Sequence, residues 1–196
     1  MPNNISITVD YKEALKSVKR IQKNQIPFAA SQALNDVVFE ASKALKSKAP
    51  LYLDRPTPFT IRGFRFKKST KRNLTALVYI APTQAAYLHY QVEGGIKRKE
   101  TAVPVNVKLN KYGNIPGKKR GLKRNTRQYF AIVNGIYGLW ERSRRGNKIK
   151  LIVRIHKVVK YDKKRLPFYS IVRRSVAKQW QRAFLRRYNA ALKTAR

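Results

Sequence analysis

The feature that most constrains this chain is its charge: 45 lysines and arginines stand against nine aspartates and glutamates, a formal net charge of +36. Like charges repel one another in a compact state, so a fold must spread them over its surface, and such a surface attracts polyanions. The excess is not a tail, because residues 1–100 carry 18 basic and 7 acidic side chains and residues 101–196 carry 27 and 2. Hydrophobic residues still make up 43% of the chain, which favours a folded protein over a charged coil.

The charge leaves three classes of partner: nucleic acid, an acidic protein surface or anionic lipid. Membrane insertion is not expected, because the chain has no apolar run of about 20 residues. The opening MPNNISITVD lacks the apolar segment of a signal peptide, so we expect the protein to be made and kept in a cytoplasm. Cysteine is absent, which excludes a disulfide, a thiolate nucleophile and a cysteine-bound metal.

The length of 196 residues predicts a single domain over residues 1–196. Alternating apolar residues predict a first strand, and Asp10 with Glu13 three residues later forms a capping box that begins a helix. An alanine-rich helix follows, with Pro27 in its first turn and Pro50 at its end. The predicted elements are a strand at 5–9, helices at 11–24 and from about 27 to 48, strands at 64–67 and 74–80, and a short helix at about 82–92 that stops at Gly94.

The regular spacing of apolar residues that predicts helices and strands is lost over residues 96–127. Glycine, proline and basic residues are frequent in this segment, so we expect a long basic loop or arm there. Three strands follow, joined at Asn134-Gly135 and at the RRGN turn, and the odd positions of the last strand are expected to face a core. A closing amphipathic helix begins at about Pro167 and has one apolar and one basic face. The predicted fold class is therefore α+β: an antiparallel sheet flanked by amphipathic helices, with a long basic arm.

Groups suited to catalysis are scarce in this chain. The only histidines, His89 and His156, fall in separate predicted elements, and neither has the spacing of a metal-binding or catalytic motif. Asp36 and Glu40 lie four apart on one helix face, where a metal pair is conceivable but ion pairing to surrounding lysines is the ordinary interpretation. Since no phosphate-binding glycine loop occurs either, we expect no enzymatic activity, no cofactor and no metal.

Nucleic-acid binding fits the composition better. The arm combines cations, which neutralise phosphates, with Tyr112, Tyr129 and Phe130, which could stack on bases. No base-reading motif is present, so binding would follow charge and shape rather than sequence. Equally open is a loop whose charges face acidic neighbouring subunits. The candidate contact residues are the cations of the arm, of the RRGN turn and of the closing helix: Lys118, Lys119, Arg120, Lys123, Arg124, Arg127, Arg144, Arg145, Arg186 and Arg187.

Several segments resemble a family in the same order. DRPTPFT after the alanine-rich helix, KKSTKRNLTALVYI, YLHYQVEGG, AVPVNVKLNKYGNIPG and the closing RLPFYSIVRRSVAKQWQRAFLRRYNAALKTAR are similar to segments of tailed-phage minor tail or tail-completion proteins of the minor tail protein Z family. The resemblance covers most of the chain. It carries over no catalytic residue.

The resemblance implies a structural virion protein at the head–tail junction, in the neck or at the head-proximal end of the tail. Such proteins are thought to form a homo-oligomeric ring, often a hexamer, around the virion DNA. Their partners would be the tail terminator, the tail tube, and the portal or adaptor. The alternatives are a ribosomal or other non-specific nucleic-acid-binding protein, which the same charge would suit, and a nuclease, which the shortage of acids and histidines disfavours.

Overall fold

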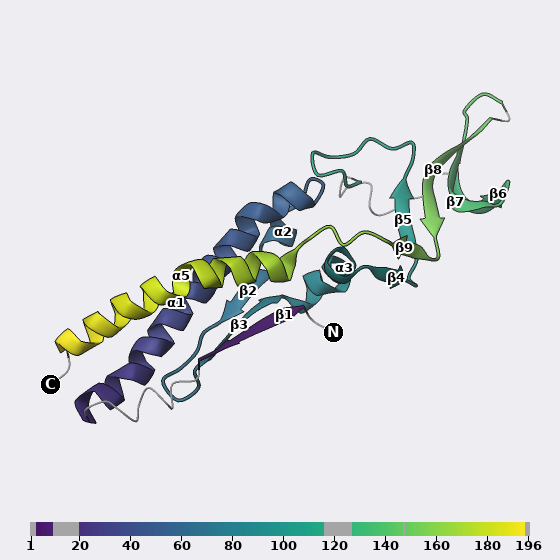
Figure 1. The fold of residues 1–196 in the computed structure, drawn as a ribbon. Coiled ribbons are helices and arrows are strands. Elements are labelled where there is room, and N and C mark those ends of the chain that lie inside the picture. Colours follow the sequence, from purple (N-terminus) through teal and green to yellow (C-terminus); the bar gives the residue numbers. More distant parts are fainter. Residues whose placement is uncertain (1–2, 10–19, 116–126, 147, 195–196) are drawn as a thin grey trace. The chain divides into compact units, whose positions relative to one another are not determined.

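The structure is a computed structural model that describes residues 3–9, 20–115, 127–146 and 148–194 (Figure 1). The chain divides into two compact units, one made of residues 1–92 and 165–196 and the other of residues 93–164. Helices and antiparallel sheets together make an α+β fold, which confirms the predicted class. The prediction of one domain over residues 1–196 concerns how the two units behave together, and it stays a prediction.

The first unit is built on a three-stranded antiparallel sheet in the order β1-β3-β2. β1 spans Asn4–Thr8, β2 spans Phe64–Lys67 and β3 spans Thr75–Ile80, close to the bounds that the sequence predicts. Buried and half-buried side chains alternate along β3, with Val78 and Ala76 fully buried. One face of the sheet is therefore apolar and needs to be covered by helices.

Two long helices supply that cover. α1 spans Arg20–Tyr52 and packs on β2 and β3, while α5, Phe168–Thr194, lies alongside α1 (Figure 1). Small side chains permit the close helix contact: Ala33 of α1 is fully buried and Ala183 of α5 nearly so, in one cluster with Val37. The largest fully buried side chains of this unit are Leu34, Leu45, Phe64, Ile80, Leu88, Leu166 and Phe168.

The two helices predicted at 11–24 and 27–48 are corrected by the structure. A single helix, α1, continues through Pro27 and Pro50, and its hydrogen-bond ladder extends beyond the second proline, with the Leu53 N–H donating to the Ala49 carbonyl at 3.0 Å. A proline removes only one donor from a helix, and the burial of neighbouring side chains against the sheet outweighs that loss. Residues 10–19, which hold the predicted capping box, lie outside the described residues.

Two short helices complete the first unit. α2, Pro58–Ile61, begins after Thr57, whose side-chain oxygen accepts the Thr60 N–H at 3.2 Å, a standard cap. α3, Pro82–Glu93, ends at Gly94, whose φ of +74° only glycine adopts without strain. α3 confirms the short helix that the sequence predicts at about 82–92 and its stop at Gly94.

The second unit consists of strands. They are, in chain order, β4 (Gly95–Lys97), β5 (Thr101–Pro104), β6 (Gln128–Val133), β7 (Ile136–Arg142), β8 (Ile149–His156) and β9 (Val159–Tyr161). β4 pairs with β9, and the other four form an antiparallel sheet in the order β5-β8-β7-β6. The predicted three-stranded meander is thus present, with a fourth strand added at its edge.

The hairpin between β6 and β7 turns at Asn134 and Gly135, which both have positive φ, 49° and 75°. These angles are those of a type I′ turn, as the Asn-Gly pair predicts. The expected alternation of β8 is wrong in part, because the register shifts where β7 and β8 pair. As a result Ile152 and Val153 are both buried, at 8% and 2% exposure, whereas Ile149 is exposed.

The expected uninterrupted loop over 96–127 is also corrected. Its first part contains β4 and β5, and the segment after β5 is ordered by asparagines: Asn110 Oδ1 accepts the N–H groups of Tyr112 and Asn114 at 2.9 and 3.0 Å. Strands of three or four residues leave little periodicity, and their partners lie about 50 to 65 residues away in the sequence. Residues 116–126 lie outside the described residues.

Candidate nucleic-acid interface

Half of the predicted contact residues fall where the structure gives no description. Lys118, Lys119, Arg120, Lys123 and Arg124 belong to residues 116–126, so their role stays a prediction. Of the remaining five, Arg127 stands directly before β6 and Arg144 and Arg145 lie in the β7–β8 turn, all in the second unit, whereas Arg186 and Arg187 lie on α5 of the first.

In the second unit, Arg127 and Arg144 line a hollow of about 400 Å³ at the turn end of the β7–β8 hairpin. We call it the hairpin hollow; its lining residues are Arg127, Glu141, Arg142, Ser143, Arg144, Lys148, Ile149 and Lys150. Arg145 lies in the turn beside it, with its carbonyl 3.5 Å from the Ser143 hydroxyl that donates to it. The hollow therefore gathers two predicted residues and three further cations that sequence reasoning missed.

The sequence of the hairpin contains a signal for the three missed cations, Arg142, Lys148 and Lys150. In an antiparallel hairpin, residues at matching distances from the turn are cross-strand neighbours, and here Glu141 stands opposite Lys150 and Arg142 opposite Ile149. Reading the RSRRGNKIK segment as two facing strand ends, rather than as one run of basic residues, places these side chains around a common space.

The electrostatics of the hairpin hollow are one-sided. Its lining carries five cations and one carboxylate, Glu141, whose Oε1 accepts a hydrogen bond from the Gln128 amide at 3.3 Å. Arg142, Arg144, Lys148 and Lys150 are exposed, and none of them has a carboxylate within salt-bridge distance among the described residues. Such a concave, basic surface concentrates anions.

The two predicted residues on α5, Arg186 and Arg187, bind a carboxylate of α1. Arg187 forms a two-pronged hydrogen-bonded ion pair with Asp36 of α1, at 2.7 Å to each carboxylate oxygen, and Arg186 donates to the same carboxylate at 2.8 Å. The arginine hydrogen bonds, first that of Arg187, hold the pKa of Asp36 below its ordinary value despite partial burial, and the pair raises the pKa of Arg187. These contacts join α5 to α1.

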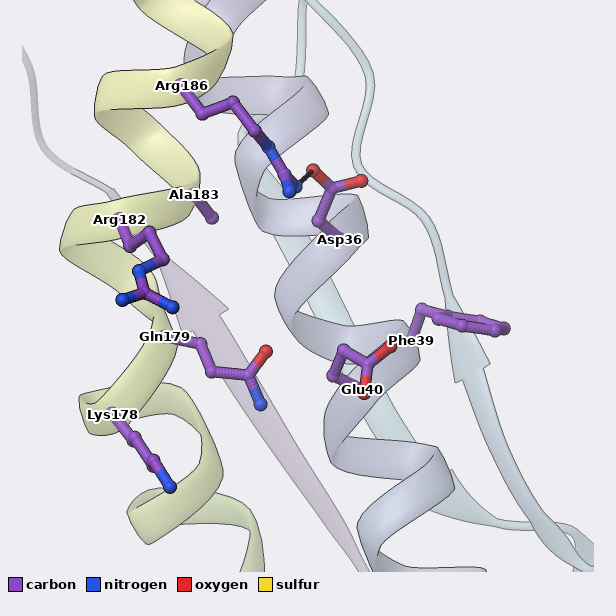
Figure 2. A pocket seen from close by; sticks show the side chains of 8 residues that line it. All are labelled: Asp36, Phe39, Glu40, Lys178, Gln179, Arg182, Ala183 and Arg186. Atoms are coloured by element: carbon purple, nitrogen blue, oxygen red, sulfur yellow. Dashed lines mark hydrogen bonds and ion pairs between the residues drawn. The ribbon is translucent and has the colours of Figure 1, made fainter.

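Asp36 also borders an open groove of about 640 Å³ between the same helices (Figure 2). Its lining mixes both signs of charge: Asp36, Phe39 and Glu40 come from α1, and Lys178, Gln179, Arg182, Ala183 and Arg186 from α5. Figure 2 shows the Gln179 side chain extending toward Glu40, and Arg186 joined to Asp36. Asp36 is thus ion-paired, but to two arginines of α5 and not to the surrounding lysines, and Glu40 forms no ion pair with a described residue.

The histidines lie apart from these surfaces. His89 belongs to α3, with its ring 5.5 Å from that of Tyr90, and His156 ends β8 in the other unit. In the described ranges, no group of three or more histidines, aspartates or glutamates is arranged to hold a metal ion.

The aromatic residues of the predicted stacking surface are separated. Tyr129 and Phe130 are neighbours on β6 and point to opposite faces of the sheet, and the Phe130 ring lies 6.3 Å from that of Tyr137. The Lys111 ammonium lies over the ring of Tyr112, 5.1 Å from its centre. Tyr112, Tyr129 and Phe130 thus form no continuous platform for successive bases.

Comparison with protein-family models, curated proteins and solved structures finds no match for this chain. Over the part of the chain that the structure describes, no helix is both long and apolar enough to cross a bilayer. The functional interpretation therefore depends on the chain's own residues and on the resemblance to minor tail proteins.

Proposed function

We propose that this chain is a structural virion protein of the tailed-phage head–tail junction, which assembles as a homo-oligomeric ring around the DNA path and contacts DNA without sequence preference. The observation that carries the proposal is the net charge of +36, which continues over both compact units. In residues 93–164 alone there are 21 basic and 4 acidic side chains, a difference of +17. The order of motifs shared with minor tail proteins supports the location.

A ring around DNA would explain how such a high positive charge is neutralised. Six copies would carry a formal charge of +216, six times 36, which repels itself unless a polyanion or acidic partners neutralise it. Packaged DNA inside the ring, together with acidic rims of the tail terminator, the tail tube, and the portal or adaptor, would supply the opposite charge. Exposed cations along α5 support such contacts: Arg173, Arg174, Lys178 and Arg182.

Electron microscopy tests the location. In virions produced from the genome that encodes this chain, density for the protein is expected at the head-proximal end of the tail, with rotational symmetry about the DNA. The proposal is overturned if the chain is missing from that region. Co-purification with ribosomal particles in place of virions would favour the alternative of a ribosomal or other nucleic-acid-binding protein.

Salt-dependent binding tests the DNA contact of the arm. The variant replaces six cations by glutamine, and its control replaces six exposed cations of the first unit. Binding to duplex DNA is expected to weaken steeply with salt for the wild type, and the slope of log affinity on log salt is expected to fall by about 0.9 for each phosphate that the variant no longer neutralises. An unchanged slope in the arm variant would show that the arm does not contact DNA. The substituted residues are Lys118, Lys119, Arg120, Lys123, Arg124 and Arg127 in the variant, and Lys43, Lys46, Lys48, Lys67, Lys68 and Lys71 in the control.

A further inference from the structure

We propose that the hairpin hollow is a phosphate-binding site that holds the backbone of duplex DNA. The inference rests on the DNA contact in the proposed function and assigns that contact to particular residues outside the arm. It would hold for a duplex-binding protein of any location, so it can be tested apart from the virion.

The first support is the local excess of one sign of charge. Five cations and one carboxylate line a space of about 400 Å³, a formal balance of +4. The carboxylate of Glu141 is already engaged by the Gln128 amide and faces Lys150 across the strands. Gathering like charges in one concave surface costs free energy in the free protein, and a bound anion that carries several charges would recover it.

The second support is the fixed backbone beneath the cations. The Arg142 N–H donates to the Arg127 carbonyl and the Ser143 N–H to the Lys148 carbonyl, both at 2.9 Å. Lys150 stands in the β8 ladder opposite Glu141. The Cα positions of the lining cations are thus set before any ligand arrives, which lowers the ordering cost of binding.

The third support concerns which nucleic acid fits. Ile149 is the only apolar side chain in the lining, and no lining residue is aromatic. Single strands bind largely by stacking their bases on aromatic rings, for which the hollow has no surface. A duplex keeps its bases inside and presents phosphates outward, where arginine and lysine bind them regardless of sequence. The hollow therefore matches duplex backbone.

The experiment compares two full-length variants that each replace three exposed cations. The hollow variant is Arg144→Gln with Lys148→Gln and Lys150→Gln, and the control is Lys43→Gln with Lys46→Gln and Lys48→Gln on α1. Fluorescence anisotropy measures binding to two labelled duplexes of unrelated sequence over a range of salt. For the hollow variant, the slope of log affinity on log salt is expected to fall by about 2.7 on both duplexes, because three phosphate contacts are lost at about 0.9 each. The control is expected to keep the wild-type slope.

The following outcomes overturn the inference: an unchanged slope in the hollow variant, or an equal fall in both variants, which would mean a diffuse field and no built site. A loss of binding to polyglutamate as large as the loss for DNA would indicate an acidic protein partner instead. Should the triple variant not fold, Lys148→Glu alone at this exposed position is expected to lower the slope by about 0.9 or more, and an unchanged slope there counts against the site. If microscopy excludes the neck but the slope falls, the proposed function fails and this inference stands.

Discussion

The ion pair between α1 and α5 offers a sharp test of how the first unit is held together. Replacing Asp36 by asparagine keeps the side-chain shape but removes the charge that receives three hydrogen bonds from Arg186 and Arg187. A buried hydrogen bond to a charged group contributes about 1.5–3 kcal/mol, whereas an exposed ion pair contributes about 0–1 kcal/mol. The Asp36 side chain is 25% exposed, that of Arg187 39% and that of Arg186 65%, so the Arg187 bonds count most. We expect a loss of about 1–2 kcal/mol in the free energy of unfolding at pH 7.

Urea unfolding followed by tryptophan fluorescence measures this loss. Trp180 lies on α5 and Trp140 in the other unit, so a Trp140→Phe background leaves a reporter in the first unit alone. The urea concentration at which half of the protein is unfolded should fall, while the slope of the unfolding free energy on urea concentration stays the same. The matched control is Glu40→Gln, which removes the same charge one turn along α1, where no described residue forms an ion pair with it. An equal effect of both substitutions would refute the role of the Asp36 contacts.

The pH dependence adds a second criterion. The pKa of Asp36 is lowered in the folded protein, chiefly by the Arg187 hydrogen bond, so the ionised form stabilises the fold. This stabilisation is complete above the unfolded pKa of about 3.9 and is lost as pH falls through the lower folded pKa. The difference in stability between wild type and Asp36→Asn should therefore be constant from pH 7 to about 5 and shrink below about 4. A difference that persists unchanged at the lowest pH would contradict the reasoning.

Three further substitutions test separate parts of the packing. Gly138→Ala should destabilise the second unit by about 3 kcal/mol or more in thermal unfolding, since its Cβ would collide with the Val153 carbonyl; an unchanged melting temperature would refute the close approach. Asn35→Ala should cost about 1–3 kcal/mol and speed hydrogen exchange at Ser69, whose N–H donates to Asn35 Oδ1 at 2.8 Å; unaltered exchange would argue against that bond. Trp180→Ala should cost about 2 kcal/mol, less than a fully buried tryptophan, because the ring is half-buried; a loss above about 4 kcal/mol would show a deeper site.

The candidate contact residues show how far a local pattern reaches. Arg144 of the RRGN turn lines the hairpin hollow, and its role as a contact stays a prediction. Arg186 and Arg187 could not be distinguished from other cations of α5, because their partner Asp36 lies about 150 residues away. A pattern along one helix records which face is basic, but it does not record which cations meet a carboxylate across the interface.

What the sequence determined by itself is the local structure and the sign of the surface. Short-range patterns placed the Asn134-Gly135 hairpin, the stop at Gly94 and the apolar face of the closing helix, since turn angles and periodicity act within a few residues. Tertiary structure decided the rest. Continuation of α1 through Pro27, the register shift that buries Ile152, and the pairing of β5 with β8 all depend on burial or on partners distant in the chain. Their free energy comes from contacts that no local pattern encodes.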